Sequence, residues 1–184
     1  EEVNKGKVFE DCDLSLNKKD IEGYTIVDEP KDLNVKFEEE TKTYVFYYAK
    51  NSNVIVKYLE KDETIEDNSD NTILADETII SGYEGMKYSA ELKDIENYTV
   101  VDSTENTTGV MGRDTIEVIF YYVPNAKVIA NHIDKESGEI LDTVEYLGKV
   151  GDTYKTESKN FEGYILDEVP ENETGIMTKE VIEV

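Results

Sequence analysis

The 184-residue chain has few of the residues on which most catalytic and metal sites depend. It contains one cysteine, Cys12, and one histidine, His132. A single cysteine excludes a disulfide within the chain and a zinc site made of several thiolates. We interpret the single imidazole, His132, as a core or edge residue of a strand and not as a catalytic base. We therefore expect a protein that is not an enzyme and that needs no cofactor.

Positive charge is also scarce. The chain has 19 Lys and Arg against 43 Asp and Glu, which gives a formal net charge of −24. The negative electrostatic field of such a chain repels a phosphate backbone, so the composition excludes a nucleic-acid-binding protein. It disfavours an anionic membrane surface for the same reason.

Long apolar runs are missing as well. No stretch approaches the roughly 20 apolar residues that a membrane span requires, so we expect no membrane insertion. The first residues do not resemble a signal peptide, and the last do not resemble an anchoring tail. With 38% hydrophobic and 10% aromatic residues, the chain can still build cores.

What the chain does contain is a repeat. An acidic segment centred on a tyrosine, which we call the recurring phrase, occurs three times, around Tyr24, Tyr98 and Tyr164. The three sequences are "DIEGYTIVDEP", "DIENYTVVDSTENTTGVM" and "NFEGYILDEVPENETGIM". The first two tyrosines are 74 residues apart and the last two are 66 apart. The flanking segments repeat at the same offsets. Self-similarity at a fixed period predicts an array of modules.

The repeat defines three copies, which we place at residues 1–50, 51–123 and 124–184. The first copy has no counterpart of the segment "NVIVKYL", and the third stops before a counterpart of "IFYY". Only about five residues join one copy to the next, and linkers that short favour an elongated, stiff row of modules.

The residue pattern of each copy predicts a mainly β structure. Residues 115–122 alternate, with Ile116, Val118, Phe120 and Tyr122 on one face, which is the pattern of a half-buried strand. We predict four or five strands in a copy, with at most a helical turn within residues 86–95 and 153–161. Because Tyr24, Tyr98 and Tyr164 recur just before a strand, we expect them to close the small cores.

These motifs, in this order, resemble the MucBP (mucin-binding protein) repeats of Gram-positive surface proteins. The parts that carry the resemblance are the Val54–Tyr58 strand, the Gly-x-x-Gly-x-x-Tyr phrases at 82–88 and 148–154, the recurring tyrosines, and the Asn-x-Thr-Gly phrases at 106–109 and 172–175. The resemblance implies small β-grasp, ubiquitin-like modules. It also implies an extracellular location on a bacterial cell wall, with the signal and anchor outside these residues, and adhesion to mucin or other host glycans.

Sugar binding needs exposed aromatic faces beside amide or carboxylate groups. By the alternation of the closing strands, Tyr47 and Tyr121 point away from Phe46, Phe120 and Tyr122, so they are the candidate binding residues. The alternative is that both pack against a loop or the next module. Weak candidates for calcium are Glu66, Asp67 and Asp70, although their spacing is not that of a calcium-binding loop.

Two hypotheses follow. The first is a non-enzymatic adhesion module whose partner is a host glycan or a mucin-like glycoprotein. Since mucins carry sialic acid and sulfate, neutral sugars or protein epitopes are electrostatically easier targets for so acidic a chain. The second is a passive stalk or spacer that projects another domain from the cell wall. The sequence does not indicate an oligomeric state.

Overall fold

The computed structural model describes residues 1–61 and 71–184, and it is mainly β, with 48% of residues in strands and 2% in helices. The predicted mainly β class is confirmed. The chain forms two compact units. Unit 1 contains Glu1–Val56, Thr78–Ala90 and Asn106–Val118, and unit 2 contains Lys57–Glu77, Glu91–Glu105 and Ile119–Val184.

The first copy contains short strands and a single helical turn. Its elements are β1 (Asp11–Asp13), the 3-10 helix η1 (Leu14–Asn17), β2 (Tyr24–Asp28) and β3 (Asn34–Lys36). The strands β1 and β3 form an antiparallel pair. Strand β2 pairs antiparallel with β4 (Tyr47–Glu60), which continues into the middle copy.

The middle copy is built around β4 and the long strand β9 (Ile116–Ile133). Its other strands are β5 (Ile73–Tyr83), β6 (Lys87–Ser89), β7 (Tyr98–Ser103) and β8 (Thr108–Val110). In the sheet, β9 and β5 pair with β4, and β7 pairs with β9, while β6 and β8 form a separate antiparallel pair.

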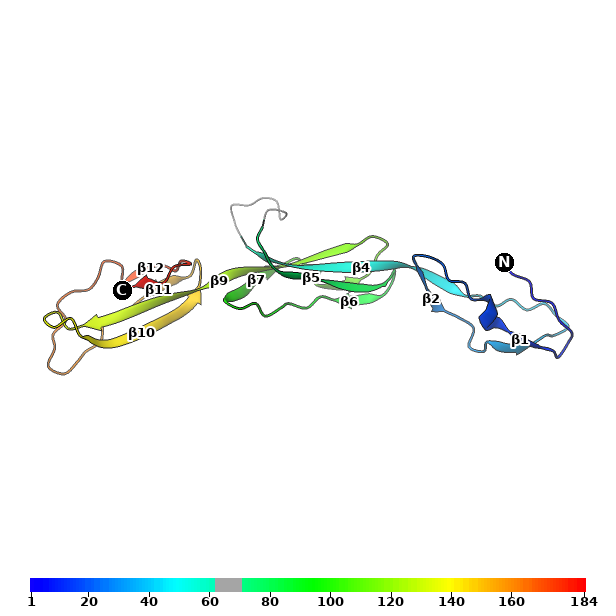
Figure 1. The fold of residues 1–184 in the computed structure, drawn as a ribbon, viewed down its shortest axis with the longest axis horizontal. Coiled ribbons are helices and arrows are strands. Elements are labelled where there is room, and N and C mark those ends of the chain that lie inside the picture. The colour runs from blue at the N-terminus through cyan, green and yellow to red at the C-terminus, as the bar shows by residue number, and fades with distance from the viewer. Residues whose placement is uncertain (62–70) are drawn as a thin grey trace. The chain divides into compact units, whose positions relative to one another are not determined.

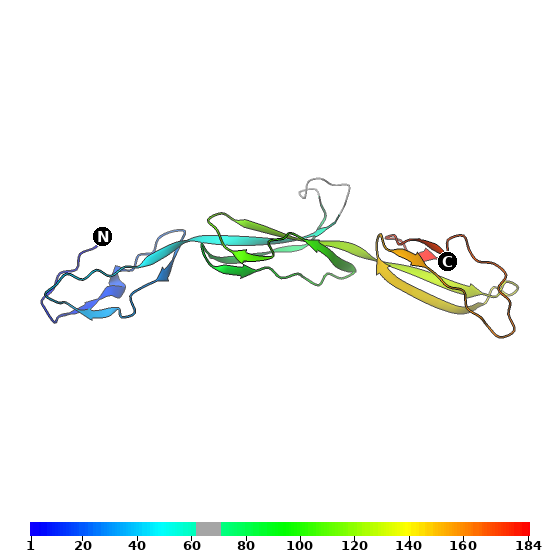
Figure 2. The same cartoon turned by 180° about the vertical axis from the view of Figure 1, so that it is seen from behind.

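The third copy uses the second half of β9 as its first strand. The hairpin partner β10 (Ile140–Lys149) runs antiparallel to it, as both faces of the ribbon show (Figures 1 and 2). The terminal strand β13 (Ile182–Glu183) pairs with β9 in parallel, and β11 (Thr153–Lys155) pairs with β12 (Thr174–Ile176). Residues 86–95 and 153–161, where the sequence allowed at most a helical turn, form β6 and β11 with irregular segments after them.

The Gly-x-x-Gly-x-x-Tyr and Asn-x-Thr-Gly phrases meet in space. In unit 1 the buried Tyr88 donates its hydroxyl hydrogen to the backbone C=O of Asn106 at 3.0 Å. A Cβ on Gly109 would lie 3.1 Å from the Tyr88 ring, so glycine leaves room for the aromatic side chain. The Asn106 amide in turn donates to the C=O of Glu117 at the start of the closing strand.

Unit 2 repeats this arrangement in the third copy. Tyr154 donates to the C=O of Asn172 at 3.1 Å, and Gly175 faces the Tyr154 ring. Around it, Ala126, Val128 and Met177 are buried and form a small cluster with this tyrosine. The motifs that carry the family resemblance are thus the contacts that build each core.

A second tyrosine attaches the irregular segment before the first two recurring phrases. The Tyr122 hydroxyl accepts from the Lys93 N–H at 3.1 Å and donates to the Lys93 C=O at 2.8 Å. Tyr48 does the same with Lys19, at 2.9 Å for both bonds. The Tyr122 side chain is fully buried, and this burial raises its pKa.

We expect Tyr122→Phe to lower the free energy of unfolding by about 1–3 kcal/mol, because the substitution leaves a part-buried N–H and C=O of Lys93 without their partner. Urea unfolding followed by circular dichroism measures the change. Tyr47→Phe is the matched control, since the Tyr47 side chain is exposed, and it should stay within about 0.5 kcal/mol of the parent. Equal effects of the two substitutions would contradict this role of the hydroxyl.

Candidate binding surface

Tyr47, one of the two candidate binding residues, lies exposed at the start of β4. Its side chain is 56% exposed, and it sits opposite Asp28 of β2 in the antiparallel register. The register shifts by one residue between Ile26 and Asp28, which is a β-bulge. Bulges redirect a side chain at the edge of a sheet, and this one brings a carboxylate opposite an exposed ring.

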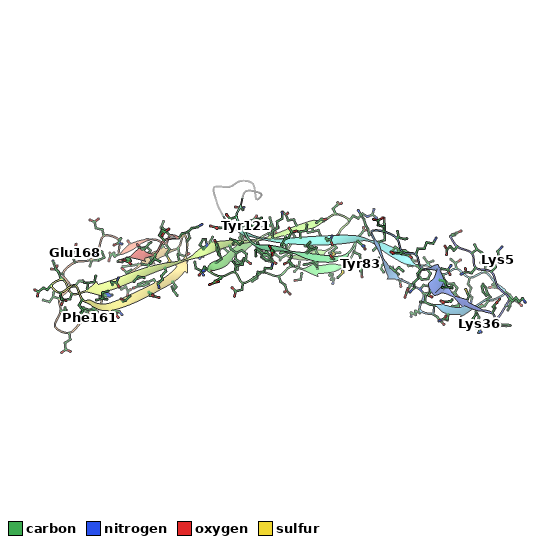
Figure 3. The ribbon with its side chains drawn as sticks, in the orientation of Figure 1. Lys5, Lys36, Tyr83, Tyr121, Phe161 and Glu168 are labelled. Carbon is green, nitrogen blue, oxygen red and sulfur yellow. The ribbon has the colours of Figure 1, made fainter. Side chains whose placement is uncertain are left out.

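Tyr121, the other candidate, has the same register in the middle copy. It sits opposite Asp102 of β7, again after a one-residue shift, this time between Val100 and Asp102. The Asp102 carboxylate accepts from the Ser103 N–H and pairs with Lys61 at 3.3 Å, and both contacts lower its pKa, the first more strongly. Tyr121 itself is half-buried, and Figure 3 labels it. We call each of these pairs a tyrosine–aspartate platform: Tyr47 with Asp28, and Tyr121 with Asp102.

The recurring tyrosines lie elsewhere than expected. Tyr24 and Tyr164 are 46% and 50% exposed, and Tyr98 is half-buried, so none of the three closes a core. Each follows a residue with positive φ, which turns the chain into the next segment: Gly23, Asn97 and Gly163. A residue in the left-handed conformation at this point lets the chain turn. The tyrosine that follows it lies at one end of its copy in space, although not in sequence.

Tyr98 takes part in a contact with the third copy, within unit 2. Its hydroxyl donates to a Glu60 carboxylate oxygen at 3.1 Å, and Lys179 pairs with the other oxygen. The Glu60 side chain is only 15% exposed. Burial, followed by the hydrogen bond to Glu60, raises the pKa of Tyr98. The recurring tyrosine therefore belongs to a junction between copies.

The corresponding junction in unit 1 has related contacts. Arg113, which is the repeat counterpart of Lys179, forms a hydrogen-bonded ion pair with Glu84 of its own copy at 3.0 Å, and this pairing raises the pKa of Arg113. Threonine-to-asparagine bonds of 2.7 Å occur at both junctions, from Thr25 to Asn51 and from Thr99 to Asn125.

His132 takes the place of a tyrosine. Its ring nitrogen Nε2 lies 3.2 Å from the C=O of Glu157, and its ring meets Phe161 edge-on. At the equivalent positions of the middle copy, the Tyr58 hydroxyl donates to the C=O of Glu91 at 3.1 Å. The geometry supports the structural interpretation of His132.

No group of three or more His, Cys, Asp or Glu side chains that could hold a metal ion occurs within residues 1–61 and 71–184. The calcium candidates Glu66, Asp67 and Asp70 lie outside the described residues. Across the same described ranges, no helix is long and apolar enough to cross a membrane.

A protein-family model described as the MucBP domain matches residues 4–49, 53–123 and 127–184. The chain belongs to the MucBP domain family. Two curated proteins are similar to this MucBP chain over 164 residues, or 87% of its length. Both are named Internalin J: one from Listeria monocytogenes serovar 1/2a (strain ATCC BAA-679 / EGD-e) is 32% identical, and one from Listeria monocytogenes serotype 4b (strain F2365) is 30% identical. The match spans 19% and 18% of these relatives, so the chain corresponds to about a fifth of their length.

Sequence reasoning on this MucBP chain missed Asp28 and Asp102. The signal was present, since an aspartate follows the recurring tyrosine by four residues in both phrases. Neither the bulge nor the cross-strand partner could be deduced from that spacing. The Glu60 and Lys179 pair had no signal of its own, because the two residues are 119 positions apart.

The ion pair between Glu60 and Lys179 should contribute measurably to stability. Lys179→Met should destabilise the chain by about 0.5 kcal/mol, since Lys179 is mostly exposed and solvent screens the pair. In a Glu60→Gln background the same change should have no further effect, and in 1 M salt it should shrink because the charges are screened. A double-mutant cycle by urea unfolding measures this coupling. Lys135→Met, which removes an exposed pair with Asp167, is the control. Additive effects of Lys179→Met and Glu60→Gln would contradict the contact.

Proposed function

We propose that the chain is a non-enzymatic adhesion module at the outer surface of a bacterial cell wall, and that it binds host mucin glycans or glycoproteins without covalent chemistry. Family membership over three segments supports an adhesion-type surface module. The observation that carries the binding proposal is the tyrosine–aspartate platform, which occurs at the same register in two copies.

The chemistry of a platform suits a sugar. The face of a tyrosine ring packs against the C–H face of a pyranose, and a neighbouring carboxylate accepts hydrogen bonds from its hydroxyls. Asp28 and Asp102 are both exposed, so each carboxylate is within reach of a ligand that covers the adjacent ring. Tyr47 offers the larger exposed surface, and we assign it the greater share of the binding energy.

The net negative charge of the chain favours one kind of glycan ligand over another. With a net charge of −24, the chain repels sialylated and sulfated glycans at low salt. Neutral sugars, or the protein part of a glycoprotein, are therefore the favoured ligands. In the middle copy, Lys61 beside Asp102 partly offsets the local negative charge.

A passive spacer is the second candidate, and the repeated junction contacts favour it. Besides the threonine-to-asparagine bonds, Glu84 N–H donates to the C=O of Lys50 at 2.8 Å, and Val150 N–H donates to the C=O of Pro124 at 2.9 Å. Such bonds restrict the bending of one copy against the next, which is what a spacer that projects another domain requires.

Binding to a glycan array or to immobilised mucin distinguishes the two candidates. Tyr47→Ala should weaken a saturable signal about tenfold, which corresponds to about 1.4 kcal/mol, and Tyr121→Ala should weaken it less. Asp28→Asn should have an intermediate effect because the amide keeps one acceptor. Tyr44→Ala, at another exposed tyrosine, is the control and should leave binding unchanged. The assay is run with and without calcium. A folded parent chain that gives no saturable signal in either condition would leave the spacer as the function.

A further inference from the structure

The three methionines of the chain differ in how far solvent reaches them. Met111 is 1% exposed and Met177 is 5% exposed, whereas Met86 is 38% exposed. A peroxide oxidises a thioether to a sulfoxide where it can reach the sulfur. Exposure therefore makes Met86 the reactive methionine of the folded chain.

Met86 closes a tight turn that begins at Tyr83, the last residue of β5, which Figure 3 labels. Its N–H donates to the C=O of Tyr83 at 3.0 Å, and Gly85 within the turn has a φ of +92°. The Met86 sulfur lies against Gly82, because a Cβ on this glycine would be 2.7 Å from Sδ. The sulfur of Met111 lies 2.6 Å from the same position. An exposed and a buried thioether thus share one glycine.

The third copy has the same turn with a different side chain. Asp152 is the counterpart of Met86 at the offset of 66 residues, and its N–H donates to the C=O of Lys149 at 3.1 Å. A Cβ on Gly148, the counterpart of Gly82, would lie 3.1 Å from the Oδ2 atom of Asp152. The sulfur in one copy and the carboxylate oxygen in the other therefore occupy equivalent places.

The contacts of Asp152 show what this place holds well. Oδ1 accepts from the Lys149 ammonium at 2.8 Å, and Oδ2 accepts from the Lys149 N–H at 3.0 Å. Both contacts lower the pKa of Asp152, the ammonium more strongly. In the middle copy the corresponding N–H belongs to Tyr83. A thioether sulfur is a weak acceptor, whereas an oxygen bonded to that sulfur would be a strong one.

The exposure belongs to the position rather than to methionine. The Asp152 side chain is 36% exposed, close to the value for Met86. Both turns lie beside the preceding copy, which the N–H of Glu84 contacts through the C=O of Lys50, and Val150 forms the corresponding bond at the second junction. A neighbouring copy is thus present at both turns, and each side chain stays open to solvent.

We propose that Met86 is a redox-modification site, at which a peroxide converts the thioether to a sulfoxide without loss of the fold. The sulfur lone pair attacks one oxygen of hydrogen peroxide and the O–O bond breaks. The released hydroxide takes the proton of the transferred oxygen and leaves as water, so that sulfur loses two electrons and the peroxide gains them. The new oxygen takes the place of the Asp152 carboxylate and accepts from the Tyr83 N–H.

The first test exposes the folded 184-residue chain to hydrogen peroxide and follows each methionine by peptide mass spectrometry. Met86 should be oxidised at least about tenfold faster than Met111 and Met177. In concentrated urea, where none of the three is buried, the rates should be similar. Met86→Leu, which keeps an apolar side chain of similar size, should leave only the slow reactions. Equal rates in the folded chain would overturn the assignment.

Hydrogen exchange of the Tyr83 amide tests where the new oxygen lies. Exchange should slow at least about threefold after oxidation of Met86, because the amide gains a stronger acceptor. Met86→Gln should slow it in the same way without peroxide, since the glutamine oxygen is bonded to the atom that corresponds to Sδ. A rate that is unchanged or faster after oxidation would rule out the proposed hydrogen bond.

Stability separates the exposed site from the core. The urea midpoint of unit 1, followed through its amide signals, should stay within about 0.3 M of the parent after oxidation of Met86 and in Met86→Gln. Met111→Gln should lower it by about 1 M or more, because this substitution buries an amide. A fall after oxidation of Met86 as large as that of Met111→Gln would overturn the proposal. No glycan enters these measurements, so they are independent of the adhesion proposal.

Discussion

Tyrosine hydroxyls that bind backbone groups hold the irregular segments of this chain on its sheets. Tyr88 and Tyr154 bind the carbonyls of the Asn-x-Thr-Gly turns, and Tyr48 and Tyr122 bind both backbone groups of a lysine. Each copy is too small to cover itself with regular structure, so long stretches without a ladder need another attachment. A tyrosine supplies it because its ring fills the core and its hydroxyl satisfies the backbone at the rim. The glycine opposite each core tyrosine and the asparagine beside it are consequences of that arrangement.

The strands could be predicted from the sequence where one face is buried. Val54, Val56 and Tyr58 alternate with less buried residues, as the period-2 pattern indicates, and all three are buried in the structure. The alternation fails at Leu59 and Ile119, which are buried although they lie on the other face. Neighbouring segments cover that second face, and a single-strand pattern carries no information about them. The prediction that the recurring tyrosines close the cores was wrong for a related reason. Recurrence shows that each copy needs the residue, but it does not show whether the side chain packs in the core or, as Tyr98 does, contacts a residue at the junction between copies.

The candidate site could be predicted only in part. The alternation predicted that both tyrosines point outward, and Tyr47 is exposed, but Tyr121 is half-buried. The partners Asp28 and Asp102 depend on a bulge in each edge strand, which shifts the pairing by one residue. A one-residue shift reverses which side chains share a face, so local spacing could not identify the partner.

Two strands serve more than one copy. Residues 47–60 of β4 include the point where the first copy ends and the middle one begins, and residues 116–133 of β9 include the next such point. The end of one module and the start of the next are therefore a single hydrogen-bonded ribbon rather than a linker. Each copy meets the next through the shared strand and the threonine-to-asparagine bonds beside it, which couples their stabilities in the manner of a one-dimensional repeat protein. A pulling force applied along the chain passes from copy to copy through continuous β-strand, and an excised copy keeps its fold only if the cut lies beyond the shared strand.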